Sequence, residues 1–172
     1  MTLLVRFARR QASWEGERSA EELQQLEFRK SDGSPDLHPS VYLIADQAPV
    51  VTQTYAEHSA TPPIKPERST IGIDTVGCAD EVRTIDGSPR FAFVRAAHRE
   101  FAIKDLPSLL AFVASLQERV RASRCRVVTR EQVVAYARTR IAAQDPEWIA
   151  VAKLAENDWL KALRRLIPEE RE

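Results

Sequence analysis

The feature that most constrains the fold is a run of helix boundary signals that begins at Asp105. The carboxylate of Asp105 can accept hydrogen bonds from the free amides at the start of a helix, and Pro107 suits the first turn. Apolar residues then recur at steps of three and four, which predicts a helix with one buried face. This stripe consists of Leu109, Leu110, Phe112, Val113, Leu116 and Val120.

A short strand and two further helices are predicted after this first helix. The short run at 125–128 indicates a strand, and Thr129 and Gln132 then match the pattern of a capping box. Pro146 between two acids is typical of a helix start, and the third helix is expected to continue to about Leu166. Its apolar residues cover more of its circumference than one core contact needs, which indicates a docking surface.

The chain before Asp105 is predicted to be mainly extended, because short apolar runs alternate there with turn residues. The candidate strands are 1–7, 41–44, 50–55, 69–74 and 82–85, the last paired with 90–94 across an Asp-Gly turn. The expected fold class is therefore α+β. A mainly antiparallel sheet, formed roughly by residues 2–103, packs against a C-terminal three-helix segment that contains one short intervening strand.

The length of 172 residues favours a single domain. Three prolines in 61–68 predict a loop, which would join possible sub-lobes at 1–60 and 69–168. No apolar run approaches the roughly 20 residues of a membrane span, so no membrane partner is expected. We expect a cytoplasmic location, with Cys78 and Cys125 as free thiols and no cofactor.

Basic and acidic residues balance at 25 each over the whole chain, but a basic run breaks this balance locally. Between Arg119 and Arg140 there are seven arginines and a single acid, Glu131. Such a run is typical of a solvated or protein-contacting face, or of a phosphate-binding surface. The candidate binding surface consists of Arg119, Arg121, Arg124, Arg126, Arg130, Arg138 and Arg140, together with Trp148 and Trp159 of the third helix.

Asp74 ends the apolar segment Ile-Gly-Ile-Asp and is the sharpest candidate for a catalytic residue. With Asp105-Leu-Pro-Ser and Glu131-Gln-Val, this segment resembles the corresponding pieces of Holliday-junction resolvases, whose fold is RNase H-like. The resemblance covers about a third of the chain. It implies that Asp74 and Glu131 share divalent metal ions for phosphodiester hydrolysis, and that the basic run holds the phosphates.

The function we expect is that of a non-enzymatic protein-interaction module, with no catalytic residue and no metal. It would be an accessory or scaffold subunit of a bacterial-type complex, docking through its C-terminal helices onto another subunit or a second copy. The alternative is a nucleic-acid-binding protein or a metal-dependent nuclease of RNase H-like topology. The alternative requires Asp74 and Glu131, whereas the interaction module tolerates the loss of both.

Overall fold

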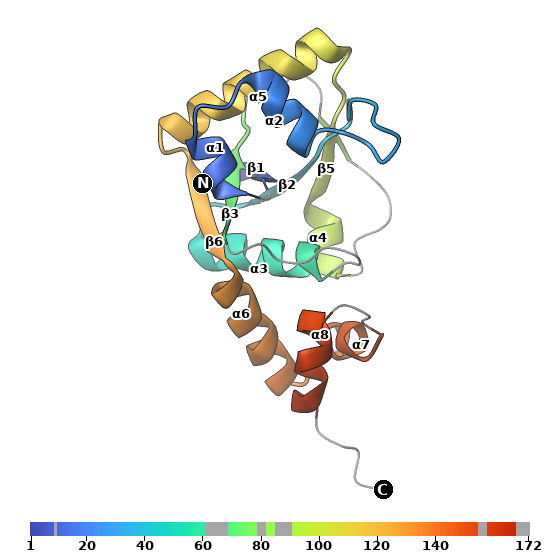
Figure 1. Ribbon diagram of the computed structural model, residues 1–172. Coiled ribbons are helices and arrows are strands. Elements are labelled where there is room, and N and C mark those ends of the chain that lie inside the picture. Colours follow the sequence, from blue (N-terminus) through green and yellow to red (C-terminus); the bar gives the residue numbers. More distant parts are fainter. Residues whose placement is uncertain (9, 61–68, 79–81, 85–90, 155–157, 168–172) are drawn as a thin grey trace, which may run out of the picture.

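The protein contains one antiparallel sheet with helices on both faces (Figure 1). The computed structural model describes residues 1–8, 10–60, 69–78, 82–84, 91–154 and 158–167. The six strands in these ranges are β1 (Thr2–Ala8), β2 (Ser40–Ala45), β3 (Ser69–Asp74), β4 (Val82–Thr84), β5 (His98–Phe101) and β6 (Cys125–Thr129). Their order across the sheet is β4-β5-β2-β1-β3-β6. The predicted α+β class is confirmed.

Strand β1 lies inside the sheet and is buried on both faces. It pairs with β2 on one side and β3 on the other, so Val5 lies between Tyr42 and Asp74. Alternate side chains of a strand point to opposite faces, and this sheet has a core on each of them. Strands from both sides of the Pro-rich segment thus share one sheet, while 61–68 itself lies outside the described residues.

Two layers of helices enclose the sheet. The first core contains residues of α1 (Gln11–Glu15), α2 (Ala20–Glu27) and α5 (Leu106–Arg121), which lie above the sheet in Figure 1. The second core contains residues of α3 (Ala48–Ser59), α4 (Ala92–Ala97) and α6 (Arg130–Ala142). This second core continues into α7 (Pro146–Leu154) and α8 (Asp158–Leu163), and the 3-10 turn Arg164–Leu166 follows.

The predicted helix starts are confirmed by their capping contacts. The carboxylate of Asp105 accepts from the Ser108 amide at 2.9 Å. At the start of α6 the hydroxyl of Thr129 accepts from the Gln132 amide at 3.2 Å, and the Gln132 side chain accepts from the Thr129 amide at 2.8 Å. Caps of this kind typically stabilise a helix by about 1 kcal/mol each.

Three predicted elements are wrong, and two of them are wrong because helical burial prevails over a local strand signal. Residues 50–55 belong to α3, where Pro49 occupies the first turn and Val51 and Tyr55 face the core four residues apart. No hairpin joins 82–85 to 90–94 among the described residues. Instead β4 pairs with β5, and Phe91 and Val94 are buried three residues apart at the start of α4.

The third correction concerns the C-terminal helix, which forms two helices, α7 and α8, pointing in different directions (Figure 1). With α6 they make a lobe beneath α3 and α4, centred on the fully buried Trp148. The ring of Trp148 lies 4.8 Å from that of Phe91 and 5.9 Å from that of Tyr136. Its indole N–H has no hydrogen-bond partner among the described residues, so Trp148 stabilises this core through its apolar contacts.

We expect Trp148→Ala to destabilise the fold by roughly 3–5 kcal/mol, since it leaves a large cavity where the C-terminal lobe meets α4. Trp148→Phe should cost only about 1–2 kcal/mol, because the indole N–H it removes has no acceptor. Leu154→Ala is the control, because Leu154 is 68% exposed and its loss should change stability by less than about 0.5 kcal/mol. Urea unfolding followed by tryptophan fluorescence or circular dichroism measures all three; equal losses for the three variants would contradict the assignment of this core.

Candidate functional site

Asp74, which is a catalytic residue only in the alternative nuclease hypothesis, is held by two arginines. Its Oδ2 atom accepts from Nη2 of Arg124 at 2.5 Å and from Nη1 of Arg119 at 3.3 Å, and its Oδ1 atom accepts from the Val76 amide at 3.1 Å. Arg119 also donates to the carbonyl oxygen of Val76 at 2.7 Å. Asp74 therefore joins the end of β3 to the end of α5 and the start of β6.

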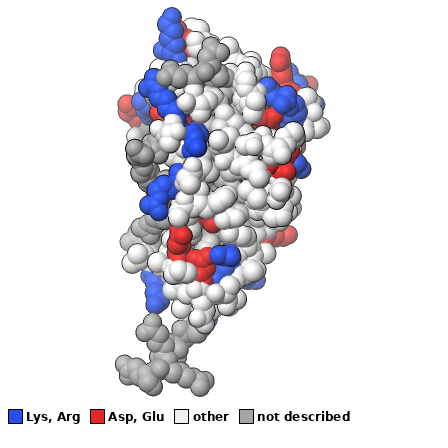
Figure 2. All heavy atoms as spheres, turned by 180° about the vertical axis from the view of Figure 1, so that it is seen from behind, with Lys and Arg blue, Asp and Glu red and all other residues white. Residues whose placement is uncertain are grey.

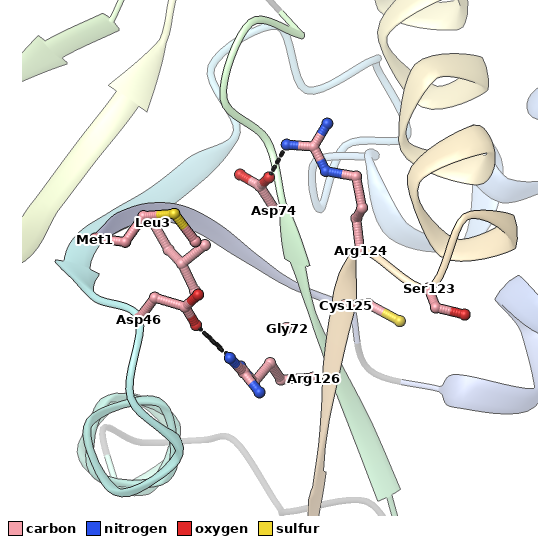
Figure 3. Close-up of a pocket in the computed structure, with 9 residues that line it drawn as sticks. All are labelled: Met1, Leu3, Asp46, Gly72, Asp74, Ser123, Arg124, Cys125 and Arg126. Carbon is pink, nitrogen blue, oxygen red and sulfur yellow. Dashed lines mark hydrogen bonds and ion pairs between the residues drawn. The ribbon is translucent and has the colours of Figure 1, made fainter.

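A second ion pair lies nearby and joins Asp46, which follows β2, to Arg126 of β6. Nε and Nη2 of Arg126 donate to Oδ1 of Asp46 at 3.0 and 2.5 Å. Between the two ion pairs lies a pocket of about 250 Å³ (Figure 3). Its lining comes from β1, β3, β6 and the ends of neighbouring turns: Met1, Leu3, Asp46, Gly72, Asp74, Ser123, Arg124, Cys125 and Arg126.

The structure does not bring Asp74 and Glu131 together. Strands β3 and β6 are antiparallel, with Ile73 opposite Cys125 and Ser69 opposite Thr129. Asp74 follows one end of this ladder and Glu131 follows the other, so roughly 15 Å of strand separates them. The two carboxylates are too far apart to share a metal ion. Among the described residues, no group of three or more His, Cys, Asp or Glu side chains is placed to hold one.

The predicted binding surface divides into exposed arginines and buried tryptophans. Six of the seven arginines are exposed, and Arg119 is half-buried. Trp148 and Trp159 are only 0% and 5% exposed, so neither indole can contact a partner in this conformation. The wide apolar surface expected for the third helix is also largely covered within the chain, since α7 and α8 pack against each other and against α6.

Four of the arginines form ion pairs with aspartates, and sequence reasoning did not predict these pairs. Besides Arg119, Arg124 and Arg126, these include Arg140, which forms an ion pair with Asp145. In the ion pairs of Arg124, Arg126 and Arg140, the arginine side chain is 44–51% exposed. The aspartate side chain of each pair is only 12–14% exposed. The aspartates lie beneath the arginines, and the surface presents the positive group.

On the face turned away from the viewer in Figure 1, basic and acidic side chains border an uncharged central area (Figure 2).

Comparisons of the chain with protein families, with curated proteins and with solved structures find no match. No helix of the described residues combines the length and the apolar character that a membrane crossing requires.

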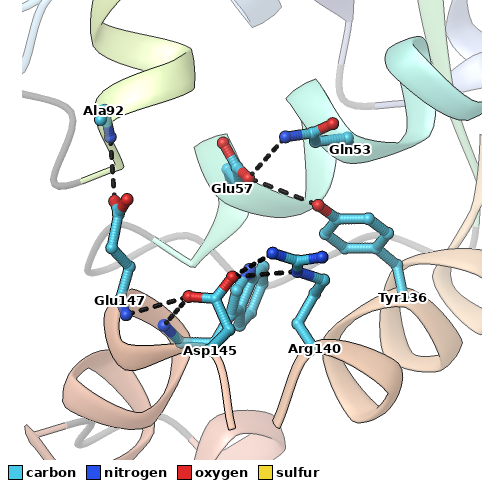
Figure 4. A network of polar contacts seen from close by, with 8 residues as sticks. Gln53, Glu57, Ala92, Tyr136, Arg140, Asp145 and Glu147 are labelled. Atoms are coloured by element: carbon cyan, nitrogen blue, oxygen red, sulfur yellow. Dashed lines mark hydrogen bonds and ion pairs between the residues drawn. The ribbon is translucent and has the colours of Figure 1, made fainter. Parts of the chain in front are cut away.

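A buried polar network lies on another side of the molecule, between α3, α6 and α7 (Figure 4). Glu57 of α3 is only 5% exposed, and its Oε1 atom accepts from Gln53 at 3.0 Å and from the Tyr136 hydroxyl at 3.5 Å. Burial raises the pKa of Glu57 to about 7, and the hydrogen bond from Gln53 opposes this shift. Sequence reasoning did not predict this site, because nothing in the neighbouring sequence shows that the carboxyl group of Glu57 is buried.

A histidine is also buried, on the same face of the sheet. His98 of β5 is 8% exposed and stacks on Tyr42, with 5.3 Å between ring centroids. The hydroxyl of Tyr42 lies 2.6 Å from Nδ1 of His58. Neither ring nitrogen of His98 has a hydrogen-bond partner within the described ranges, and burial lowers its pKa. Burial therefore favours the neutral form of His98.

Asp74→Asn should destabilise the protein by roughly 2 kcal/mol, because Arg119 and Arg124 lose an ionised acceptor while the shape of the side chain is kept. Guanidine unfolding curves at pH 7 measure this loss. Glu118→Gln, an exposed charge removal on the same helix as Arg119, is the matched control and should change stability by less than about 0.5 kcal/mol. An unchanged midpoint for Asp74→Asn would show that the ion pairs do not stabilise the sheet end.

Glu57→Gln should stabilise the protein at alkaline pH. The carboxyl of Glu57 has its pKa raised from 4.5 to about 7 in the folded state, so its contribution to stability is complete below about 4.5 and is lost as the pH rises through 7. Glutamine cannot ionise, and the variant should gain on the order of 3 kcal/mol over wild type at pH 8.5 but less than half of that at pH 5.5. Urea unfolding at both values tests this, with exposed Glu131→Gln as the control; equal differences at the two pH values would contradict it.

Proposed function

We propose that the chain is a protein-interaction module that docks an extended acidic segment of a partner protein along β6 and the first turns of α6. The observation that supports this most directly is that β6 is an edge strand. In the described part of the chain it has one ladder partner, β3, and Val127 in its middle is 44% exposed. An exposed edge strand of this kind can accept a further strand from another protein.

The register indicates which backbone groups of β6 are available. The Asp74 amide donates to the Arg124 carbonyl oxygen at 3.1 Å, and bonded and non-bonded pairs alternate in an antiparallel ladder. Residues 126 and 128 therefore bond to β3, whereas Cys125, Val127 and Thr129 direct their N–H and C=O groups outward. The amide of Thr129 is already used by Gln132, so Cys125 and Val127 supply the docking hydrogen bonds.

The charge of the surroundings favours an acidic partner. Arg121 and Arg130 are both exposed and flank the strand at its two ends. On α6, a shallow and mainly apolar groove of about 270 Å³ includes Arg130, Glu131, Val134, Ala135 and Arg138 in its lining. A strand carrying Asp or Glu beside apolar residues matches both the charge and the groove.

A second copy of the chain fits this edge less well. An antiparallel pairing of two β6 strands centred on residue 125, 126 or 127 places an arginine of one copy opposite an arginine of the other. Like charges directly opposite each other destabilise strand pairing. Single-stranded nucleic acid would need aromatic side chains on which its bases could stack. Tyr136, the aromatic residue within the basic run, instead packs against Trp148 and donates to Glu57.

The test is a selection of random dodecapeptides on the purified protein, followed by affinity measurements on synthetic copies of the enriched peptides. We expect acidic, strand-forming peptides whose binding weakens with salt. Val127→Pro should weaken binding at least tenfold, because it removes the outward N–H without touching the β3 ladder. Val127→Thr keeps that N–H and should bind as wild type does.

Three outcomes would overturn the proposal. The first is the absence of enriched peptides, or enrichment of peptides without acids. The second is equal binding by the Val127→Pro and Val127→Thr variants. The third is a concentration-dependent dimer in analytical ultracentrifugation that Val127→Pro abolishes, which would make a second copy the occupant of the edge.

A further inference from the structure

We propose that the pocket between the Asp74 and Asp46 ion pairs binds a small monocarboxylate with a short apolar body. The pocket is a site of its own, on the face of the sheet end where Arg124 and Arg126 point, rather than along the outward edge of β6 (Figure 3). The proposal does not depend on the docking of a partner segment.

The first support is the set of donors that the ion pairs leave available. Arg126 uses Nε and Nη2 on a single oxygen of Asp46, and Arg124 uses Nη2 on Asp74. No described residue accepts from Nη1 of Arg126, nor from Nε or Nη1 of Arg124. A guanidinium group carries five N–H donors, so the terminal edge of Arg126 can form a forked contact with the two oxygens of a second carboxylate.

The second support is the charge of the cluster. Three guanidinium groups, those of Arg119, Arg124 and Arg126, face two carboxylates, those of Asp46 and Asp74. Among these five side chains there is one positive charge in excess, and a single negative charge would balance it. Because the aspartates are only 12–14% exposed and already accept from the arginines, an entering anion meets the guanidinium groups first.

The third support is the size and the wall of the pocket. A volume of about 250 Å³ corresponds to roughly eight water molecules at their share of liquid volume. Leu3 and the side chain of Met1 give one wall an apolar character, and Gly72 adds no side chain to the lining. This space fits an acid of a few carbon atoms.

The experiment is a titration of the ¹⁵N-labelled protein with butyrate at constant ionic strength, followed by NMR. Butyramide is the neutral isostere, and inorganic phosphate is an anion of different shape and charge. We expect saturable shifts of the amide signals of Gly72 and of residues 123–126 with butyrate, and none with butyramide. Butyrate should also raise the unfolding temperature, because it binds only the folded state.

Variants of the pocket complete the test. Arg126→Gln should weaken butyrate binding at least tenfold, and Arg126→Lys, which keeps the charge but loses the fork, at least threefold. Arg95→Gln on α4 is an exposed charge removal outside the pocket lining and should bind as wild type does. Circular dichroism checks that each variant is folded, and the lysine variant serves if the glutamine variant is not.

Equal responses to butyrate and butyramide would show an apolar cavity without anion recognition and would overturn the proposal. Tighter binding of phosphate than of butyrate would overturn the carboxylate as the ligand. Absence of saturable shifts, or unchanged affinity in both Arg126 variants, would overturn the site itself.

Discussion

The structure depends on strand β1, whose pairing with β2 and β3 places the first residues of the chain inside the sheet. The side chains of β1 alternate between two apolar cores, so the sheet needs a helical layer on each face. Helices α1, α2 and α5 supply one layer, and α3, α4 and the C-terminal lobe supply the other. Both proposed sites follow from this arrangement, because the pocket forms where β1 begins and β3 ends, and β6 is left at the border of the sheet.

Local signals predicted the helix starts and the α+β class. Asp105, Thr129 and Gln132 act on backbone amides three residues away or fewer, and such short-range chemistry can be read from sequence. The strand predicted at 50–55 failed because its valines and Tyr55 suit both a strand and a buried helix face, and only the surrounding core decides between them. The pairings of Arg124 with Asp74 and of Arg126 with Asp46 span 50 and 80 residues, beyond the reach of any local pattern.

The ion pairs with aspartates also reduce the net charge of the basic run. By count, the segment from Arg119 to Arg140 has a large positive excess, which sequence reasoning could assign to phosphate or to protein. In the fold, Asp46, Asp74 and Asp145 neutralise much of this excess from below, while the guanidinium groups stay at the surface. The result is a surface with many directional donors and a small net charge. Such a surface suits recognition of particular carboxylates better than it suits attraction to a uniformly charged polymer.

Strand β6 ends at Thr129 and α6 begins at Arg130, with no loop between them. The capping box of Thr129 and Gln132 stabilises this junction. The twist of β6 therefore sets the direction in which α6 leaves the sheet. Trp148 and its neighbours fix α7 and α8 to that helix and to α4. Because α6 continues directly from the border strand, the position of the C-terminal lobe relative to the sheet is set at Thr129.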